Sequence, residues 1–330
     1  MLIRRPDQPG EIRSLSGLVR GGGLCTVVLV SLLIMGLQSA PARAENPNVA
    51  LPTLGGTQFW ADEHLRNGWR IQRHVWTGHY RLLDSDNVRL AWGSYAHCLE
   101  KLGESRVPRP QSRHLVLLVH GIGRGPGTFG DLPGILRKAG FEAHAISYPS
   151  IRGSIEAHAT QLEKLLQRLR HVDEVSFVTH SMGGIIVRQL LARDGAWKSS
   201  IRPGRIVMIA PPNQGSLTAQ TLQPAWPYKL VYGAAGQQLT PEKVMKRPVP
   251  AIPFGIIAGG LGDGEGYNPL LPGDDDGTVA VAETRLEGAA DFMVLPGLHG
   301  FVARSQEIEL LVLNFLSSGH FNPARSRHDG

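Results

Sequence analysis

The stretch V-T-H-S-M-G-G, residues 178–184, places one serine between two apolar runs, E-V-S-F before it and I-I-V-R-Q-L-L after it. The first run is typical of a buried strand and the second of a helix. A serine at such a junction is either a helix cap in a tight turn or a nucleophile raised on a sharp bend. Small residues such as Gly183 and Gly184 suit a sharp bend, which brings neighbouring elements close together. The rest of the chain decides between the two interpretations.

Strand-like and helix-like segments alternate around this stretch. The pattern predicts strands at 114–120, 141–148, 174–180, 205–210, 254–260 and 291–295, and helices at 154–170, 183–193 and 305–318. The strands are continuous apolar runs, which predicts an α/β fold with a mostly parallel central sheet and helices on both faces. In such a sheet ligands bind at the carboxyl ends of the strands, so the loops that follow strands are where chemistry is expected.

The composition limits the classes of protein to consider. The chain has 330 residues, 42% of them hydrophobic, which is enough for one large core or at most two. Half of the net charge of +6 lies in residues 1–44, and the remainder is dispersed. No basic stripe is present, so we do not expect a nucleic-acid partner.

The N-terminus has the pattern of a signal peptide, residues 1–44. Arginines precede an apolar core at 24–37, and Ala42-Arg43-Ala44 fits a cleavage site. We expect export to the periplasm or beyond the cell; the alternative is an uncleaved membrane anchor, for which the core is short, since a span needs about 20 residues. Cys25 would leave with the signal peptide, and Cys98 would remain alone without an intrachain disulfide.

The mature chain divides into three predicted regions. Residues 45–110 form an N-terminal extension with two or three short antiparallel strands that join the sheet. Residues 111–319 form the α/β domain, in which 213–253 is a long connection expected to fold as a cap over the pocket. Residues 320–330 are expected to be a disordered tail.

The first candidate loop is H-G-I-G-R-G-P-G-T-F, residues 120–129. A dinucleotide-binding frame beginning at Gly121 would need glycine where Pro126 stands, and no phosphate-binding G-K-[ST] occurs. The alternatives are a structural glycine-rich turn and an oxyanion loop that offers the Ile122 N–H.

The second candidate loop carries Ser181. The nucleophile-elbow pattern is G-x-S-x-G, and here it is T-H-S-M-G, with Thr179 in place of the first glycine. In a nucleophile elbow the Met182 N–H would be the second oxyanion donor. His180 precedes the serine, and we expect its side chain to point away and to have a structural role.

Three adjacent carboxylates follow in P-G-D-D-D-G, residues 272–277. Such a cluster is a solvated turn, a calcium site or the source of an acid that orients a histidine; the spacing of an EF-hand is absent. His299, in L-P-G-L-H-G-F just past the last predicted strand, is placed to act as a base. The chain order Ser181, Asp276, His299 is the order found in one convergent form of the triad.

These residues together resemble the α/β-hydrolase superfamily, in particular bacterial lipases and esterases, over about residues 110–318. The matching segments are H-G-I-G-R at 120–124, V-T-H-S-M-G-G at 178–184, A-P-P-N-Q-G-S at 210–216, D-G-T-V at 276–279 and L-H-G at 298–300. The resemblance implies an α/β-hydrolase fold with Ser181 as nucleophile, Asp276 as acid, His299 as base, and Ile122 and Met182 as oxyanion donors. Asp274 and Asp275 are alternatives to Asp276 as the acid.

The resemblance also implies an activity, the cleavage of carboxylic esters through an acyl-enzyme. The expected substrate is a small-molecule or lipid ester, with contact to a lipid interface, and no cofactor is implied, although some lipases hold a structural calcium. Asn213-Gln214 stands where the family often has a histidine, outside the triad. The alternatives are acyl transfer with the same triad and a hydrolase fold used only for binding.

Overall fold

The computed structural model describes residues 51–53, 56–222, 224 and 233–322. The chain divides into two units, 1–47 and 48–330, and every described residue belongs to the second. The predicted signal peptide, residues 1–44, therefore lies outside the described residues. Within the described ranges, none of the helices combines the length and the apolar character that a membrane span requires.

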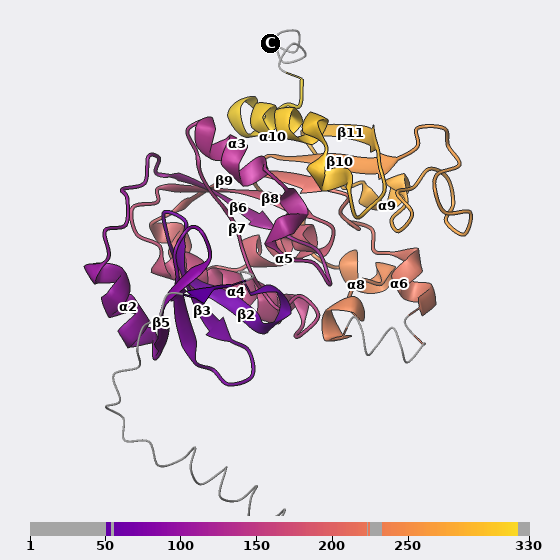
Figure 1. Cartoon of the computed structure of the whole chain (residues 1–330). Helices are drawn as coiled ribbons and strands as arrows, with labels where there is room; N and C mark the ends of the chain where they lie inside the picture. The colour runs from indigo at the N-terminus through magenta and orange to yellow at the C-terminus, as the bar shows by residue number, and fades with distance from the viewer. Residues whose placement is uncertain (1–50, 54–55, 223, 225–232, 323–330) are drawn as a thin grey trace, which may run out of the picture. The chain divides into compact units, whose positions relative to one another are not determined.

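A six-stranded parallel sheet organises the larger part of the chain (Figure 1). Its strand order is β7-β6-β8-β9-β10-β11, with bounds β6 His114–Val119, β7 Glu142–Ala145, β8 Glu174–His180, β9 Arg202–Ile209, β10 Phe254–Gly260 and β11 Asp291–Pro296. The chain runs outward from β6 to β7 on one side and to β8 on the other. This makes the carboxyl ends of β6 and β8 a topological switch point, where α/β sheets bind ligands.

Helices cover both faces of this sheet, as predicted (Figure 1). On one face, α3 (Leu132–Lys138) and α10 (Gln306–Ser318) share a core with Val116, Leu118 and Ile257. On the other face, α4 (Ile155–Arg168) and α5 (Met182–Leu191) share a core with Leu117, Phe177 and Met208. Alternate residues of each strand therefore face different helix layers, which is why apolar residues occur on both faces of the central strands.

The N-terminal extension forms a separate antiparallel sheet, so the prediction that its strands join the main sheet is wrong. The order is β1-β5-β4-β3-β2, with bounds β1 Leu51–Pro52, β2 Trp60–Arg66, β3 Trp69–His74, β4 Tyr80–Leu83 and β5 Val88–Gly93. Short turns join β2 to β3, β3 to β4 and β4 to β5, whereas β1 pairs with β5 across the intervening strands. The backbone of β2 is hydrogen-bonded to the segment after β7 through Asp62 N–H, which donates to the Ser147 carbonyl at 2.9 Å. Helix α2 (Tyr95–Glu104) packs on this sheet through Cys98 and Leu102.

The remaining elements are short. They are α6 Leu217–Leu222, α8 Pro241–Val244 and α9 Val281–Thr284, with 3-10 turns η1 Thr57–Phe59, η2 Pro126–Phe129, η3 Ala196–Ser199 and η4 Val302–Arg304. Helices α6 and α8 belong to the long connection 213–253, of which residues 223 and 225–232 lie outside the described part.

The predicted disordered tail begins too early at residue 320. Phe321 is buried and its ring packs against that of Phe315. Its N–H donates to Asp291, and its carbonyl accepts from Asn314. The apolar ring therefore anchors the chain to the sheet after α10 ends, and residues 323–330 lie outside the described part.

Candidate active site

Ser181 occupies a sharp bend between β8 and α5. Its backbone has φ 54° and ψ −129°, a strained conformation for a residue with a side chain. Two hydrogen bonds hold the bend: Ser181 N–H donates to the Ile209 carbonyl at 2.9 Å, and Gly184 N–H donates to the Ser181 carbonyl at 3.0 Å. The serine does not cap α5 with its side chain. Of the two interpretations of this stretch, the geometry is that of a nucleophile elbow.

The glycines after the serine make the bend sterically possible. A Cβ on Gly183 would lie 2.1 Å from the Val119 carbonyl oxygen, so only glycine lets α5 start this close to β6. A Cβ on Gly184 would lie 3.3 Å from the Thr179 hydroxyl. The nucleophile-elbow pattern has glycine at position 179. Thr179 fits there because its hydroxyl faces Gly184, which has no side chain.

The structure brings Ser181, Asp276 and His299 together. His299 Nε2 lies 3.0 Å from Ser181 Oγ, and His299 Nδ1 lies 2.6 Å from Asp276 Oδ2. The His299 N–H also donates to the Asp276 carbonyl at 2.8 Å, which ties the two loops together. With Nδ1–H donating to Asp276, Nε2 has its lone pair available for the serine O–H. This connected set of side chains can move a proton from the serine to the histidine.

The three adjacent aspartates have different partners. Asp274 accepts from the N–H groups of Leu261 and Gly262, and Asp275 accepts from those of Asn268 and Gly277. Asp276 accepts from Thr278 and Val279 through Oδ1 and leaves Oδ2 for His299. Asp276 alone of the three is hydrogen-bonded to His299.

The partners of the three carboxylates bear on the alternative of a calcium site. Calcium needs several oxygens that converge on one point, whereas the three carboxylates are each held by donors on different parts of the loop. In the described part of the chain, no group of three or more His, Cys, Asp or Glu side chains could hold a metal ion.

His180 lies inside the site, so the expectation that its side chain points away is wrong. Its Nε2 lies 2.8 Å from the His299 carbonyl oxygen, and the two rings are 4.8 Å apart. Ser181 has a left-handed φ, and a Cβ on Gly121 would lie 2.8 Å from Ser181 Cβ and 3.2 Å from His180 Nδ1, so both side chains adjoin the same loop. Burial, and then the neighbouring His299, hold the pKa of His180 well below its usual range. His180 therefore stays neutral and supports the loop that carries His299.

The loop after β6 lies against the serine. A Cβ on Gly121 would be 2.8 Å from Ser181 Cβ, so glycine is required at this contact. Ile122 follows in a half-buried position, and Met182 is the first residue of α5, where a backbone N–H has no acceptor within the helix. The Tyr148 hydroxyl donates to the His120 carbonyl. The two predicted oxyanion donors are thus on backbone segments that adjoin Ser181.

Gln58, in the turn η1 just before β2, is also hydrogen-bonded to this loop. Gln58 Nε2 donates to the Arg124 carbonyl at 2.7 Å and to Ser150 Oγ at 2.9 Å, and Gln58 Oε1 accepts from Ile151 N–H at 3.1 Å. Sequence reasoning missed this contact, because Gln58 is polar, lies far from the motifs and belongs to no periodic pattern.

Replacing His180 with phenylalanine should lower kcat for ester hydrolysis about tenfold, because the ring remains but the His299 loop loses a hydrogen bond. The His299 carbonyl also loses its donor, so the melting temperature should fall by several degrees. Steady-state kinetics and thermal unfolding measure the two effects.

The matched control is His114→Phe, which removes a 2.8 Å hydrogen bond to Ser176 at the amino end of β6. It should lower the melting temperature without lowering kcat. Equal kcat losses in both variants would contradict a positioning role for His180.

Comparisons with known proteins address the fold. A family model described as a domain of unknown function (DUF7379) matches residues 82–245, a range that includes Ser181 and ends before Asp276. No curated protein matches the chain. The mature form of the Bacillus licheniformis lipase BlEst2 is similar in structure, with 18% identity, a TM-score of 0.51, and coverage of 65% of this chain and 95% of that one.

The propeptide form of the same lipase gives 18% identity and a TM-score of 0.50, with coverage of 63% of this chain and 52% of that one. The chain thus spans about half of that longer form, at 52%. At 18% identity these structural similarities are evidence for the fold alone. Together with the parallel sheet, they confirm the predicted α/β-hydrolase fold, like that of bacterial lipases.

Proposed function

We propose that this chain, which has the α/β-hydrolase fold, is a serine hydrolase that cleaves carboxylic esters, with lipid-type esters as its substrates. The observation that carries the proposal is the hydrogen-bonded series Asp276–His299–Ser181, with the serine on a strained elbow. A serine hydroxyl is a weak nucleophile unless a base is within hydrogen-bond reach and a third group orients that base. This arrangement meets both conditions.

The reaction begins with attack of Ser181 Oγ on the ester carbonyl carbon. His299 Nε2 takes the hydroxyl proton, and Asp276 stabilises the imidazolium through Nδ1. When the C–O bond of the ester breaks, His299 returns the proton to the leaving alcohol. Water then attacks the acyl-enzyme with His299 as base, which releases the carboxylic acid and restores Ser181.

The negative charge that develops on the carbonyl oxygen needs donors that are already in place. We assign this role to the backbone N–H groups of Ile122 and Met182. Gly121 lets the loop approach Ser181 closely. The side chains of Tyr148 and Gln58 donate hydrogen bonds to backbone carbonyls of that loop. Because these donors are fixed before the reaction, little reorganisation is needed in the transition state.

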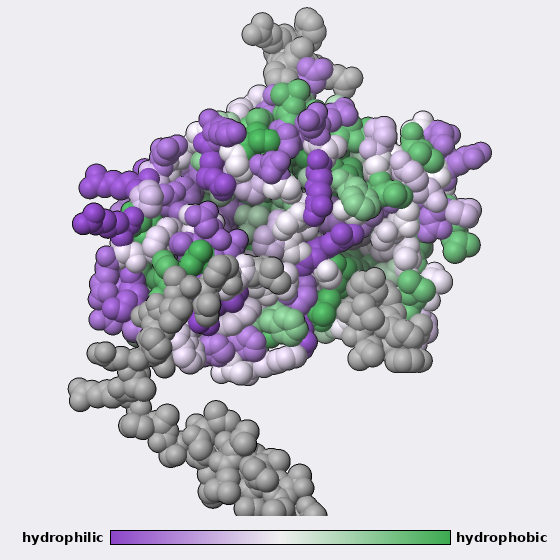
Figure 2. Space-filling model, viewed as in Figure 1, coloured by the Kyte–Doolittle hydropathy of each residue, from purple (hydrophilic) through white to green (hydrophobic). Residues whose placement is uncertain are grey.

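Apolar side chains around His299 support a lipid-type substrate. Leu298 and Phe301, which flank the histidine loop, are 44% and 66% exposed. Leu270, on the loop before the aspartates, is 90% exposed. Figure 2 shows hydrophobic surface among hydrophilic residues over the segment between α10 and α9. Exposed apolar groups of this kind suit an acyl chain or the surface of a lipid aggregate.

The connection 213–253 is proposed to supply part of the acyl-binding wall. The Thr218 hydroxyl of α6 donates to the Thr278 carbonyl at 2.9 Å, which places α6 beside the loop of Asp276. Leu217 and Leu222 on the same helix are 38% and 44% exposed. These side chains would extend the apolar surface around the site.

A panel of p-nitrophenyl esters from acetate to laurate tests the proposal. We expect kcat/KM to rise at least about tenfold from the acetate to the octanoate ester, because each buried methylene contributes about 0.8 kcal/mol. A fluorophosphonate probe should label Ser181 in folded protein and not after denaturation. A folded chain that is neither labelled nor active would favour a binding protein.

Two controls make this test specific. Phe301→Ser should reduce the preference for long chains, whereas Leu310→Ser, which removes a 60% exposed leucine from α10, should leave it unchanged. Addition of an alcohol should leave the free acid as the main product. Predominant formation of a new ester would assign the activity to acyl transfer instead.

A further inference from the structure

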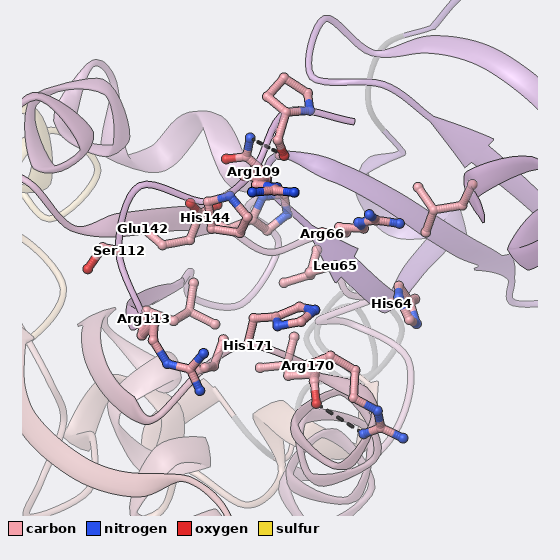
Figure 3. A pocket seen from close by; sticks show the side chains of 18 of the residues that line it. His64, Leu65, Arg66, Arg109, Ser112, Arg113, Glu142, His144, Arg170 and His171 are labelled. Atoms are coloured by element: carbon pink, nitrogen blue, oxygen red, sulfur yellow. Dashed lines mark hydrogen bonds between the residues drawn. The ribbon is translucent and has the colours of Figure 1, made fainter. Parts of the chain in front are cut away.

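A large cavity lies at the amino-terminal end of the parallel sheet, on the opposite side from Ser181. Its volume is about 810 Å³, within the usual range for small-molecule sites. The walls are the turn after β2, helix α2, the linker 105–113, the start of β7 and the loop 169–172 before β8 (Figure 3). The carboxyl ends of the strands carry the proposed catalytic residues, so none of those residues lines this cavity.

The floor of the cavity is apolar. It is made by the buried side chains of Leu65, Leu102, Leu115 and Leu169. Leu99 on α2 adds an apolar group that is 40% exposed. A floor of this kind favours the hydrocarbon part of a ligand.

The rim of the cavity is cationic. Arg66, Arg109, Arg113 and Arg170 line it. Arg113 is paired with Asp173, and Arg170 donates to two backbone carbonyls, those of Gln167 and Leu169. Arg66 and Arg109 are exposed, and within the described ranges neither guanidinium group has a hydrogen-bond or ion-pair partner. Within the described ranges, none of Arg66, Arg109 and Arg170 forms an ion pair with a carboxylate.

The arrangement of these groups is visible in Figure 3. Arg109 and His171 lie on either side of Leu65, and Arg66 lies farther along the same opening. Burial, and then the charges of Arg168, Arg170 and Arg66, lower the pKa of His64 to about 4, which reflects the positive field of this region.

One carboxyl group also lines the cavity. Glu142 is buried there, and burial raises its pKa. This single carboxyl group stands against the four arginines of the lining. The rim is therefore predominantly positive.

We propose that this cavity binds an anionic amphiphile with a single acyl chain, with the acid group at Arg66, Arg109 and Arg170 and the chain on the leucine floor. A free fatty acid and an alkyl phosphate share this chemistry. A planar guanidinium binds either acid group through two parallel hydrogen bonds. The inference is independent of the proposed hydrolase activity, because it uses none of the same residues.

Isothermal titration of the full-length Ser181→Ala chain with laurate, kept below its micelle concentration, tests this inference. We expect saturable binding that the double variant Arg66→Gln/Arg109→Gln weakens about tenfold or more, since a charged hydrogen bond contributes about 1.5–3 kcal/mol. Arg106→Gln is the matched control, because Arg106 is exposed on the same linker and does not line the cavity. It should leave the affinity unchanged.

Photo-crosslinking with a diazirine fatty acid separates this cavity from the active site. Labelled peptides should come from 64–68, 99–113 or 169–172, and labelling should fall in the double variant. Labelling confined to peptides around Ser181 or His299 would overturn the inference, as would equal binding of dodecanol. Equal binding of dodecyl phosphate would support the inference and show that the cavity accepts a phosphate as well as a carboxylate head group. Arginine-dependent binding to phosphatidylglycerol vesicles without binding of laurate would overturn it.

Discussion

Ser181→Ala is expected to lower kcat/KM for ester hydrolysis about 10⁴-fold or more, because loss of the nucleophile removes the acyl-enzyme route entirely. The methyl group fits where the serine side chain stands, and the bend has the same backbone strain with either residue. The melting temperature should therefore stay close to that of the parent. Purified variant, assayed with the preferred ester of the panel, gives the direct measurement.

Ser176→Ala is the matched control, because Ser176 lies on β8, the strand that ends just before Ser181. Ser176 Oγ accepts from Arg205 N–H at 2.9 Å, so its loss should cost about 1 kcal/mol of stability without affecting turnover. Retention of full activity in Ser181→Ala would exclude the proposed mechanism, whatever the control shows.

Asp276→Asn is expected to lower kcat by about 10⁴-fold, because an amide presents an N–H₂ group or a weaker oxygen to His299 and destabilises the required tautomer. The amide oxygen can still accept from Thr278 and Val279, so the loop should keep its conformation. KM should change much less than kcat, because Asp276 is buried and does not face the substrate.

The adjacent aspartates provide the controls for this variant. Asp274→Asn and Asp275→Asn weaken hydrogen bonds to backbone N–H groups and should lower the melting temperature while leaving kcat near the parent value. A loss of activity in either control that equals the loss in Asp276→Asn would contradict the assignment of the acid.

The main sheet could be predicted from the sequence because its strands are buried on both faces. The predicted bounds of β8 and β10, 174–180 and 254–260, agree with the structure. Nearly every residue of both strands is buried, and valine, isoleucine and phenylalanine recur in them, which is the pattern of central strands.

The N-terminal sheet was only partly predictable because its core is small and its strands carry polar groups. Strand β2 contains a buried aspartate, Asp62, and a bulge between Asp62 and His64, which interrupt the alternation of apolar residues. Helix α2 buries only Cys98 and Leu102, too few residues for a clear helical pattern. The position of the sheet depends on hydrogen bonds between segments distant in sequence, such as Asp62 and Ser147, which no local pattern contains.

The candidate site was predictable as a set of loops but not in its detail. The order of motifs indicated Ser181, Asp276 and His299. The choice among three adjacent aspartates depends on which carboxylates the loop itself uses, and the role of His180 depends on the backbone twist at Ser181. Both are properties of the folded backbone and have no signature in residue type or spacing.

The contacts of Gln58 bear on how this protein can be divided into modules. A fragment cut at the start of the parallel sheet would keep Ser181, Asp276 and His299 but lose the side chain that holds Arg124, Ser150 and Ile151 in place. A chimera that takes its N-terminal extension from another hydrolase must therefore also take the loop that Gln58 contacts. A substitution of Gln58 is therefore expected to alter turnover although it changes no residue of the parallel sheet.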